Sequence, residues 1–100
     1  MKKTAEPQSP PSSQLIKVAK CLGNKTSLTI LRYLYNNGYG LSSFIVLRTG
    51  LKQPTVSKQL KSLVAVGLVT KDKFRSCKIF AINKLQFQHL GIAVDVWLED

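Results

Sequence analysis

Apolar residues return every three or four positions over most of this chain, but not over its first part. Residues 1–13 contain Pro7, Pro10 and Pro11 among serines and threonines and show no apolar periodicity. Such a stretch cannot bury enough apolar surface to offset the entropy lost on ordering. We therefore expect a flexible arm over residues 1–13 and one folded domain over residues 14–100.

Two amphipathic helices are predicted at the start of the domain. Ser13 can cap the first, which runs to about Gly23; its apolar positions are Leu15, Ile16, Val18, Ala19 and Leu22. Asn24 can cap the second, which runs to about Asn36 with Leu28, Leu31, Leu34 and Tyr35 at helical spacing. Asn37-Gly38 ends it, and Gly40-Leu41 can add one short strand.

Two further helices follow, joined by a glycine turn. The first of this pair is predicted over residues 43–49, with Phe44, Ile45 and Leu47 as core candidates. Gly50 can adopt the positive φ that the turn requires. The next helix is predicted over residues 53–66, with Pro54 in its first turn, where a missing N–H group costs nothing. This pair is the arrangement of a helix-turn-helix.

The helix predicted over residues 53–66 has one apolar and one polar face. At about 100° per residue, Leu60, Leu63 and Val64 lie on the same face as Val56. Thr55, Lys58, Lys61 and Ser62 lie opposite, and the helix contains no acidic residue. Hydroxyl, amide and ammonium groups on an exposed helix face can reach phosphates or base edges of DNA. This face is the first candidate for a functional site.

Two strands and a last helix complete the predicted domain. The strands cover residues 68–74 and 78–83, and their connection carries cations that can bind phosphates: Lys73, Arg75 and Lys78. The last helix, residues 84–98, has one apolar stripe: Phe87, Leu90, Val94 and Trp97. We expect this stripe to pair with a second copy, with the first helix able to join. The fold class is mainly α with a small β-hairpin, a winged helix-turn-helix.

The net charge of +10 narrows the range of possible binding partners. Between Lys17 and Lys84 the only acidic residue is Asp72, whereas three of the five acids, Asp95, Glu99 and Asp100, lie at the C-terminal end. A basic body of this kind suits a polyanionic partner. Combined with the polar helix face, it favours double-stranded DNA as that partner.

Other classes of function fit poorly. No apolar run approaches the roughly 20 residues of a membrane span, and Lys2 and Lys3 precede no apolar stretch of a secretion signal. We expect a cytoplasmic protein without membrane association, in which Cys21 and Cys77 stay reduced. With one histidine, two separated cysteines and few acids, no set of catalytic groups is apparent. We predict neither an enzyme nor a cofactor.

The order of elements resembles the winged-helix repressors of the ArsR/SmtB type, over about residues 15–98. The resemblance rests on Leu22-Gly23-Asn24-Lys25, on Gln53-x-x-Val56-Ser57-x-x-Leu60, on Gly67-Leu68-Val69 and on Ile79-Phe80-Ala81-Ile82. It implies a homodimeric repressor that binds imperfect palindromes and is held together by its first and last helices. The implied interface residues are Leu15, Val18, Leu22, Phe87, Leu90, Val94 and Trp97.

The resemblance also implies roles in DNA binding. It assigns Gln53, Thr55, Ser57 and Lys58 to base edges. Lys61 and the wing residues, with Lys73, Arg75 and Lys78 among them, then bind phosphates, and Ser62 belongs to the same surface.

Several positions depart from the family pattern. Where metal-sensing members carry a cysteine pair, this chain has Leu41 to Leu47, and along the last helix Lys84, Gln86, Trp97 and Asp100 occupy the usual ligand positions. His89 alone cannot hold a zinc ion that takes four ligands, so we predict no metal site. Arg75 and Ser76 stand at the wing tip, where a glycine is usual. Lys52 replaces a capping serine before the groove helix.

Two questions stay open at the level of sequence. The alternative to a DNA-binding regulator is a winged-helix module that binds protein or RNA, since a fold does not fix a function. The mode of regulation is also open: constitutive repression, a small molecule in the dimer cleft, a protein partner, or oxidation of Cys21 or Cys77.

Overall fold

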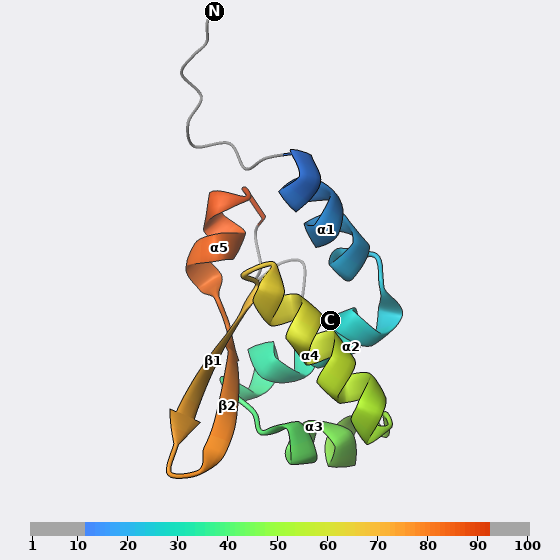
Figure 1. The fold of residues 1–100 in the computed structure, drawn as a ribbon, viewed down its shortest axis with the longest axis vertical. Coiled ribbons are helices and arrows are strands. Elements are labelled where there is room, and N and C mark those ends of the chain that lie inside the picture. Colours follow the sequence, from blue (N-terminus) through green and yellow to red (C-terminus); the bar gives the residue numbers. More distant parts are fainter. Residues whose placement is uncertain (1–11, 93–100) are drawn as a thin grey trace, which may run out of the picture.

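A computed structural model describes residues 12–92 of the chain (Figure 1). Its elements, in chain order, are α1 (Ser12–Leu22), α2 (Lys25–Asn37), α3 (Ser42–Thr49), α4 (Gln53–Ala65), β1 (Val69–Phe74), β2 (Cys77–Ile82) and α5 (Lys84–His89). The predicted fold class, a winged helix-turn-helix with a two-stranded hairpin, is confirmed. The first helix begins two residues before the predicted domain boundary.

The core forms where α2, α3 and α4 meet the base of the hairpin. α2 contributes Ile30, Leu31 and Leu34, each at most 1% exposed, and α4 contributes Val56, Leu60 and Leu63. Asn24 caps α2 as predicted, because its side-chain oxygen accepts a hydrogen bond from the Ser27 amide at 3.0 Å. The predicted apolar face of α4 is therefore the face that anchors it.

The turn between α3 and α4 forms as the sequence predicts. Gly50 has φ 76°, and its amide donates to the Val46 carbonyl at 3.0 Å, which closes α3. Pro54 lies in the first turn of α4. Lys52 stands at the N-cap of α4 and provides no side-chain hydrogen bond, so this helix begins without a side-chain cap.

Two of the three core residues predicted for α3 are exposed. Ile45 is fully buried, whereas Phe44 is 53% and Leu47 73% exposed. Phe44 and Leu47 are three residues apart and so share one side of the helix, away from the side on which Ile45 packs. An eight-residue helix that contacts its neighbours with one side leaves the other side to solvent. The prediction was wrong for Phe44 and Leu47.

The hairpin is antiparallel, with Val69 opposite Ile82 and Phe74 opposite Cys77. The short strand predicted at Gly40-Leu41 is a single bridge pair, in which Gly40 and Phe80 exchange backbone hydrogen bonds of 2.8 and 2.9 Å. A Cβ atom on Gly40 would lie 2.8 Å from Cε2 of Tyr33. The missing side chain thus allows the backbone before α3 to hold the hairpin.

The last helix is shorter than predicted. α5 ends at His89, because Gly91 takes φ 76° and turns the chain. The Gly91 amide donates to the Gln88 carbonyl and the Ile92 amide to the Phe87 carbonyl, both at 2.9 Å. This pair of bonds is the Schellman termination of a helix. A continuous helix over residues 84–98 was therefore a wrong prediction, and Val94 and Trp97 lie outside the described residues.

Candidate nucleic-acid interface

The outward face of α4 presents nearly all of its predicted DNA-binding side chains to solvent. Gln53, Ser57, Lys58, Lys61 and Ser62 are exposed, and Thr55 is half-buried. Nε2 of Gln53 donates to Oγ of Ser57 at 3.0 Å, so these two side chains form a pair one turn apart. The Ser57 hydroxyl still has its own proton to donate. The helix thus offers donors and acceptors along one exposed side.

A buried polar contact fixes the rotation of α4 about its axis. Ser27 of α2 is fully buried, and its hydroxyl donates to Oε1 of Gln59 at 2.8 Å. A buried hydroxyl without a partner costs free energy, so this bond favours one rotation of α4 against α2. Together with the packing of Val56, Leu60 and Leu63, it keeps Lys58 and Lys61 directed outward.

The hairpin has two chemically different faces. Because side chains alternate along a strand and paired residues share a face, the register places two sets of residues on opposite sides. The α4-side face consists of Val69, Lys71, Lys73, Lys78, Phe80 and Ile82. The outer face consists of Thr70, Asp72, Phe74, Cys77, Ile79 and Ala81. The α4-side face therefore carries all three lysines of the hairpin.

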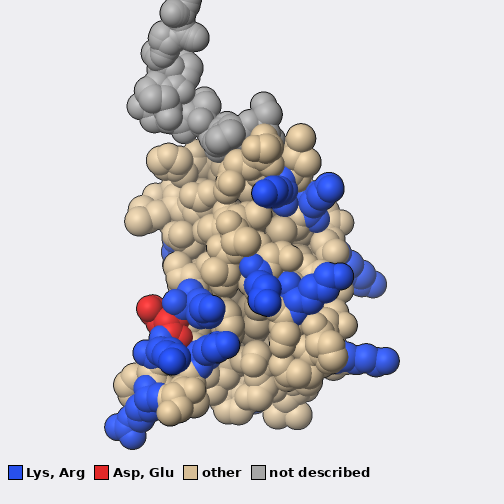
Figure 2. Space-filling view, in the orientation of Figure 1, with Lys and Arg blue, Asp and Glu red and all other residues tan. Residues whose placement is uncertain are grey.

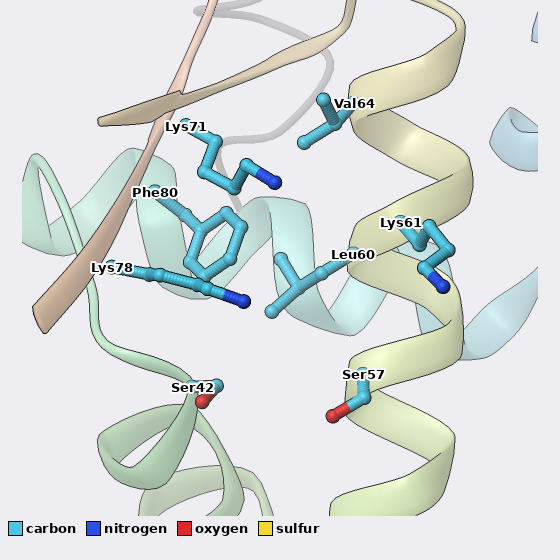
Figure 3. A pocket seen from close by; sticks show the side chains of 8 residues that line it. All are labelled: Ser42, Ser57, Leu60, Lys61, Val64, Lys71, Lys78 and Phe80. Carbon is cyan, nitrogen blue, oxygen red and sulfur yellow. The ribbon is translucent and has the colours of Figure 1, made fainter. Parts of the chain in front are cut away.

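Lys61 of α4 meets Lys71 and Lys78 of the hairpin around one cleft (Figure 3). The cleft has a volume of about 200 Å³. Lys71 and Lys78 extend from the hairpin toward α4 on either side of the Phe80 ring. Residues from two separate segments are thus brought together. Lys71 was not among the residues predicted from the sequence, although the alternation of the strand places it on the same face as Lys73.

Arg75 occupies the tip of the hairpin with an unusual backbone. Its φ is 54°, the only positive φ of a non-glycine residue in the described part of the chain. Its guanidinium lies 5.3 Å from the centre of the Phe74 ring, within the range of a cation–π contact. The wing tip therefore differs from the family pattern as predicted: Arg75 adopts a positive φ that a glycine would adopt without strain.

The charge of this side of the molecule is almost uniform. In Figure 2, cationic side chains lie over the hairpin and across the middle of the domain in the same view, with a single acidic residue beside the hairpin. Asp72 is the only acid among residues 12–92, and it lies on the outer face. A surface with this charge attracts a polyanion at long range.

The predicted dimer residues do not form one exposed stripe. Phe87 is fully buried and Val18 is 4% exposed, so both belong to the core of the single chain. Leu15 is 46% exposed, and Leu22 and Leu90 are half-buried. The exposed stripe expected on the last helix therefore does not include Phe87, because α5 inserts this residue into the core. Val18 packs into the same core from α1.

Other chemistry in residues 12–92 is sparse. Burial raises the pKa of the Cys21 thiol, which keeps it protonated at neutral pH, while Cys77 is exposed. In this part of the chain no three His, Cys, Asp or Glu side chains group in a way that could hold a metal ion. Over the same residues, none of the helices has the length and apolar character of a membrane span.

The comparisons with known proteins concern the fold. No protein-family model and no curated protein matches the chain significantly. A similar solved structure is the homodimeric winged helix-turn-helix DNA-binding domain of Mb0332 from Mycobacterium bovis, a possible ArsR-family regulator. It is 26% identical, with a TM-score of 0.74 over 96% of this chain and 88% of that one.

Two repressors are also similar. BigR from Xylella fastidiosa is 20% identical, with a TM-score of 0.66 over 85% of this chain and 86% of that one. PagR of Bacillus anthracis is 18% identical, with a TM-score of 0.67 over 78% of this chain and 88% of that one. The resemblance seen in the sequence is thus confirmed in three dimensions: the chain has the winged helix-turn-helix fold of ArsR-family transcriptional regulators.

Proposed function

We propose that this protein is a sequence-specific double-stranded DNA-binding transcriptional regulator that acts as a homodimeric repressor. Residues 53–66 enter the major groove, and the hairpin of residues 70–80 acts as the wing. The observation that carries the proposal is the meeting of Lys61 with Lys71 and Lys78 around one cleft, with no carboxylate among the lining residues. Two cationic segments on one side of a small domain are complementary to the negatively charged phosphate backbone of a duplex.

The roles proposed for individual residues follow from their chemistry and exposure. Gln53, Thr55, Ser57 and Lys58 read base edges: glutamine can make two hydrogen bonds to adenine, and lysine can donate to guanine. The residues proposed to bind phosphates are Lys61, Ser62, Lys73, Arg75 and Lys78, together with Lys71, which lies on the same face of the hairpin as Lys73 and Lys78. Phosphate contacts set the register on DNA and carry no sequence information directly.

The homodimer is supported by the fold and by apolar surface at α1 and α5. The similar domain of Mb0332 is homodimeric. Leu15 of α1 is 46% exposed, and Leu22 and Leu90 keep part of their surface in solvent. A twofold dimer presents two copies of α4, so its binding site should contain two related half-sites about one helical turn apart.

A charge-reversal experiment tests the proposed reading helix. The variant Lys58→Glu/Lys61→Glu should lower affinity for duplex DNA at least about 100-fold, because phosphate attraction becomes repulsion. The matched control Lys17→Glu/Lys20→Glu has the same spacing and charge change on the exposed side of α1. Affinity is measured by fluorescence anisotropy on DNA selected from a random pool, and dimerisation by analytical ultracentrifugation.

The two variants separate the outcomes clearly. The proposal predicts a large loss for the α4 variant, a much smaller loss for the α1 variant, and an unchanged oligomeric state for the α4 variant. Equal losses would mean that net charge alone governs binding. Normal binding by the α4 variant would exclude α4 as the reading helix.

A protein-binding module is the second candidate, and one observation favours it. Tyr39, Phe44, Leu47 and Phe74 are each at least half exposed. Tyr39, Phe44 and Phe74 line a groove of about 360 Å³ on the outer face of the hairpin. Exposed aromatic residues in one region often mark a protein contact. Duplex binding that ignores sequence and survives the Lys58/Lys61 reversal would favour this candidate.

A further inference from the structure

The cleft between α4 and the hairpin combines a cationic rim with an apolar floor. It is lined by Lys61, Lys71 and Lys78 and by the hydroxyl-bearing residues Ser42 and Ser57. The ammonium groups of Lys71 and Lys78 reach from the hairpin toward α4, whereas that of Lys61 lies over α4 itself (Figure 3). Leu60, Val64 and Phe80 form the floor. Leu60 is 2% and Phe80 6% exposed, so the floor belongs to the rigid core and not to mobile surface side chains. The cleft is therefore preformed.

A phosphate group alone would use only part of this cleft. Its oxygens would bind the ammonium and hydroxyl groups, but they would gain nothing from Leu60, Val64 or Phe80. Covering an apolar floor is favourable because it removes apolar surface from water. The floor and the aliphatic stems of Lys71 and Lys78 instead suit the body of an organic molecule.

The charge of the cleft specifies the polar end of such a molecule. No carboxylate of residues 12–92 lines the cleft, and Asp72, the one acid in that range, lies on the outer face of the hairpin. Ammonium groups form their strongest hydrogen bonds with ionised acceptors. A carboxylate at the rim would meet Lys71 and Lys78 of the hairpin, with the hydroxyls of Ser42 and Ser57 as additional donors.

We propose that this cleft binds a small organic anion with an apolar body, of the class of aromatic carboxylates with one or two rings. We further infer that the bound anion competes with DNA, because Lys71 and Lys78 serve both ligands. This second part rests on the proposed DNA-binding function, whereas the binding of the anion does not. The cleft is then an effector site within the DNA-binding surface.

The direct test uses 2-naphthoate as the probe, with amide shifts of the isotope-labelled full chain followed by NMR. The shifts should cluster at residues 57–64, 71 and 78–80. Neutral 2-naphthamide, which has the same body, should bind about tenfold more weakly, as should inorganic phosphate, which lacks the body. Shifts that cluster elsewhere, or equal binding of 2-naphthamide, would overturn the proposal.

Two variants test the rim and the floor separately. Lys71→Gln/Lys78→Gln should weaken 2-naphthoate about tenfold or more, whereas Lys17→Gln/Lys20→Gln on α1 should not. Val64→Ser replaces a half-buried floor residue and should weaken 2-naphthoate severalfold without changing the weak affinity for phosphate. Unchanged 2-naphthoate binding in either cleft variant would place the anion elsewhere and contradict the proposal.

A competition experiment separates failure of this inference from failure of the proposed function. The chain is bound to labelled duplex DNA and titrated with 2-naphthoate, with 2-naphthamide as the control at equal concentration. Release by 2-naphthoate alone supports the effector site. If duplex DNA binds but 2-naphthoate does not bind, the inference fails and the function stands. If 2-naphthoate binds and no duplex does, the function fails and the anion site stands.

Discussion

The two faces of the hairpin differ in chemistry although they come from the same twelve strand residues. The α4-side face carries Lys71, Lys73 and Lys78, of which Lys71 and Lys78 line the cleft beside α4. The outer face places Phe74, Cys77 and Ile79 beside Tyr39 and Phe44. The alternation of side chains along two paired strands is sufficient to produce this separation. The two faces can therefore be proposed to bind different partners. The α4-side face would bind DNA, and the outer face would make an apolar contact.

Among changes to the hairpin, removing the charge of the α4-side face should have the largest effect on affinity for duplex DNA. The variant Lys71→Gln/Lys73→Gln/Lys78→Gln should weaken duplex binding roughly 10- to 100-fold near 100 mM salt. It should also reduce the slope of log affinity against log salt by about one for each phosphate that the variant no longer neutralises. Fluorescence anisotropy across a salt series measures both quantities.

The matched control introduces three glutamines on the outer face instead. Thr70→Gln/Phe74→Gln/Cys77→Gln changes exposed residues and leaves the net charge as it is. Its affinity for DNA should stay within about twofold of the unmodified protein, since neutral polar changes away from DNA leave every bound phosphate neutralised. A comparable loss of affinity in both triple variants would show that the faces are not functionally distinct.

A smaller effect is expected at the hairpin tip, where the faces meet. Arg75→Gly relieves a positive φ that costs a side-chain-bearing residue roughly 1–2 kcal/mol, but it removes one cation. We expect a higher thermal midpoint, together with DNA affinity reduced severalfold and a salt slope lower by about one per subunit. Arg75→Lys keeps the charge and the strain, so it should bind like the unmodified protein. Equal affinity of the glycine and lysine variants would exclude a phosphate contact at the tip.

The smallest effect is expected from modifying the outer face chemically. N-ethylmaleimide at pH 7.5 should react with exposed Cys77 and much more slowly with Cys21, because burial both shields the Cys21 thiol and raises its pKa. A raised pKa lowers the fraction of reactive thiolate at any pH below it. Mass spectrometry of peptides gives the rates, and the Cys77-modified protein should keep its DNA affinity within about twofold. Fast labelling of Cys21, or loss of DNA binding on labelling Cys77, would contradict this assignment.

The parts of the fold that local rules determine could be predicted from sequence. The period of apolar residues indicated the buried face of α4, Asn24 marked the start of α2, and Gly50 marked the turn before α4. Each of these features depends on residues within one or two turns of one another. For the same reason, the exposure of Lys58 and Lys61 could be predicted without coordinates.

Features that depend on contacts between distant segments were predicted poorly. Phe44 and Leu47 are apolar, but only the position of α3 against α2 and α4 decides which side is buried. The cleft depends on how the hairpin is placed against α4, and a bridge between Gly40 and Phe80 joins the hairpin to the segment before α3. No local pattern of residues encodes the placement of the hairpin against α4. The end of α5, in contrast, could have been predicted from sequence, because Gly91 is a helix-stop signal. The helical spacing of apolar residues beyond Gly91 led to the prediction of a longer helix.

The salt dependence of duplex binding shows whether the exposed side of α4 and the α4-side face of the hairpin bind DNA through its phosphates. If a dimer neutralises around 6–10 phosphates, affinity should fall by roughly 10³ to 10⁵ between 50 and 200 mM salt. We expect this steep fall for the unmodified protein and a shallower one for the lysine-to-glutamine variant of the hairpin. Affinity that stays constant across the same range would contradict binding through phosphates.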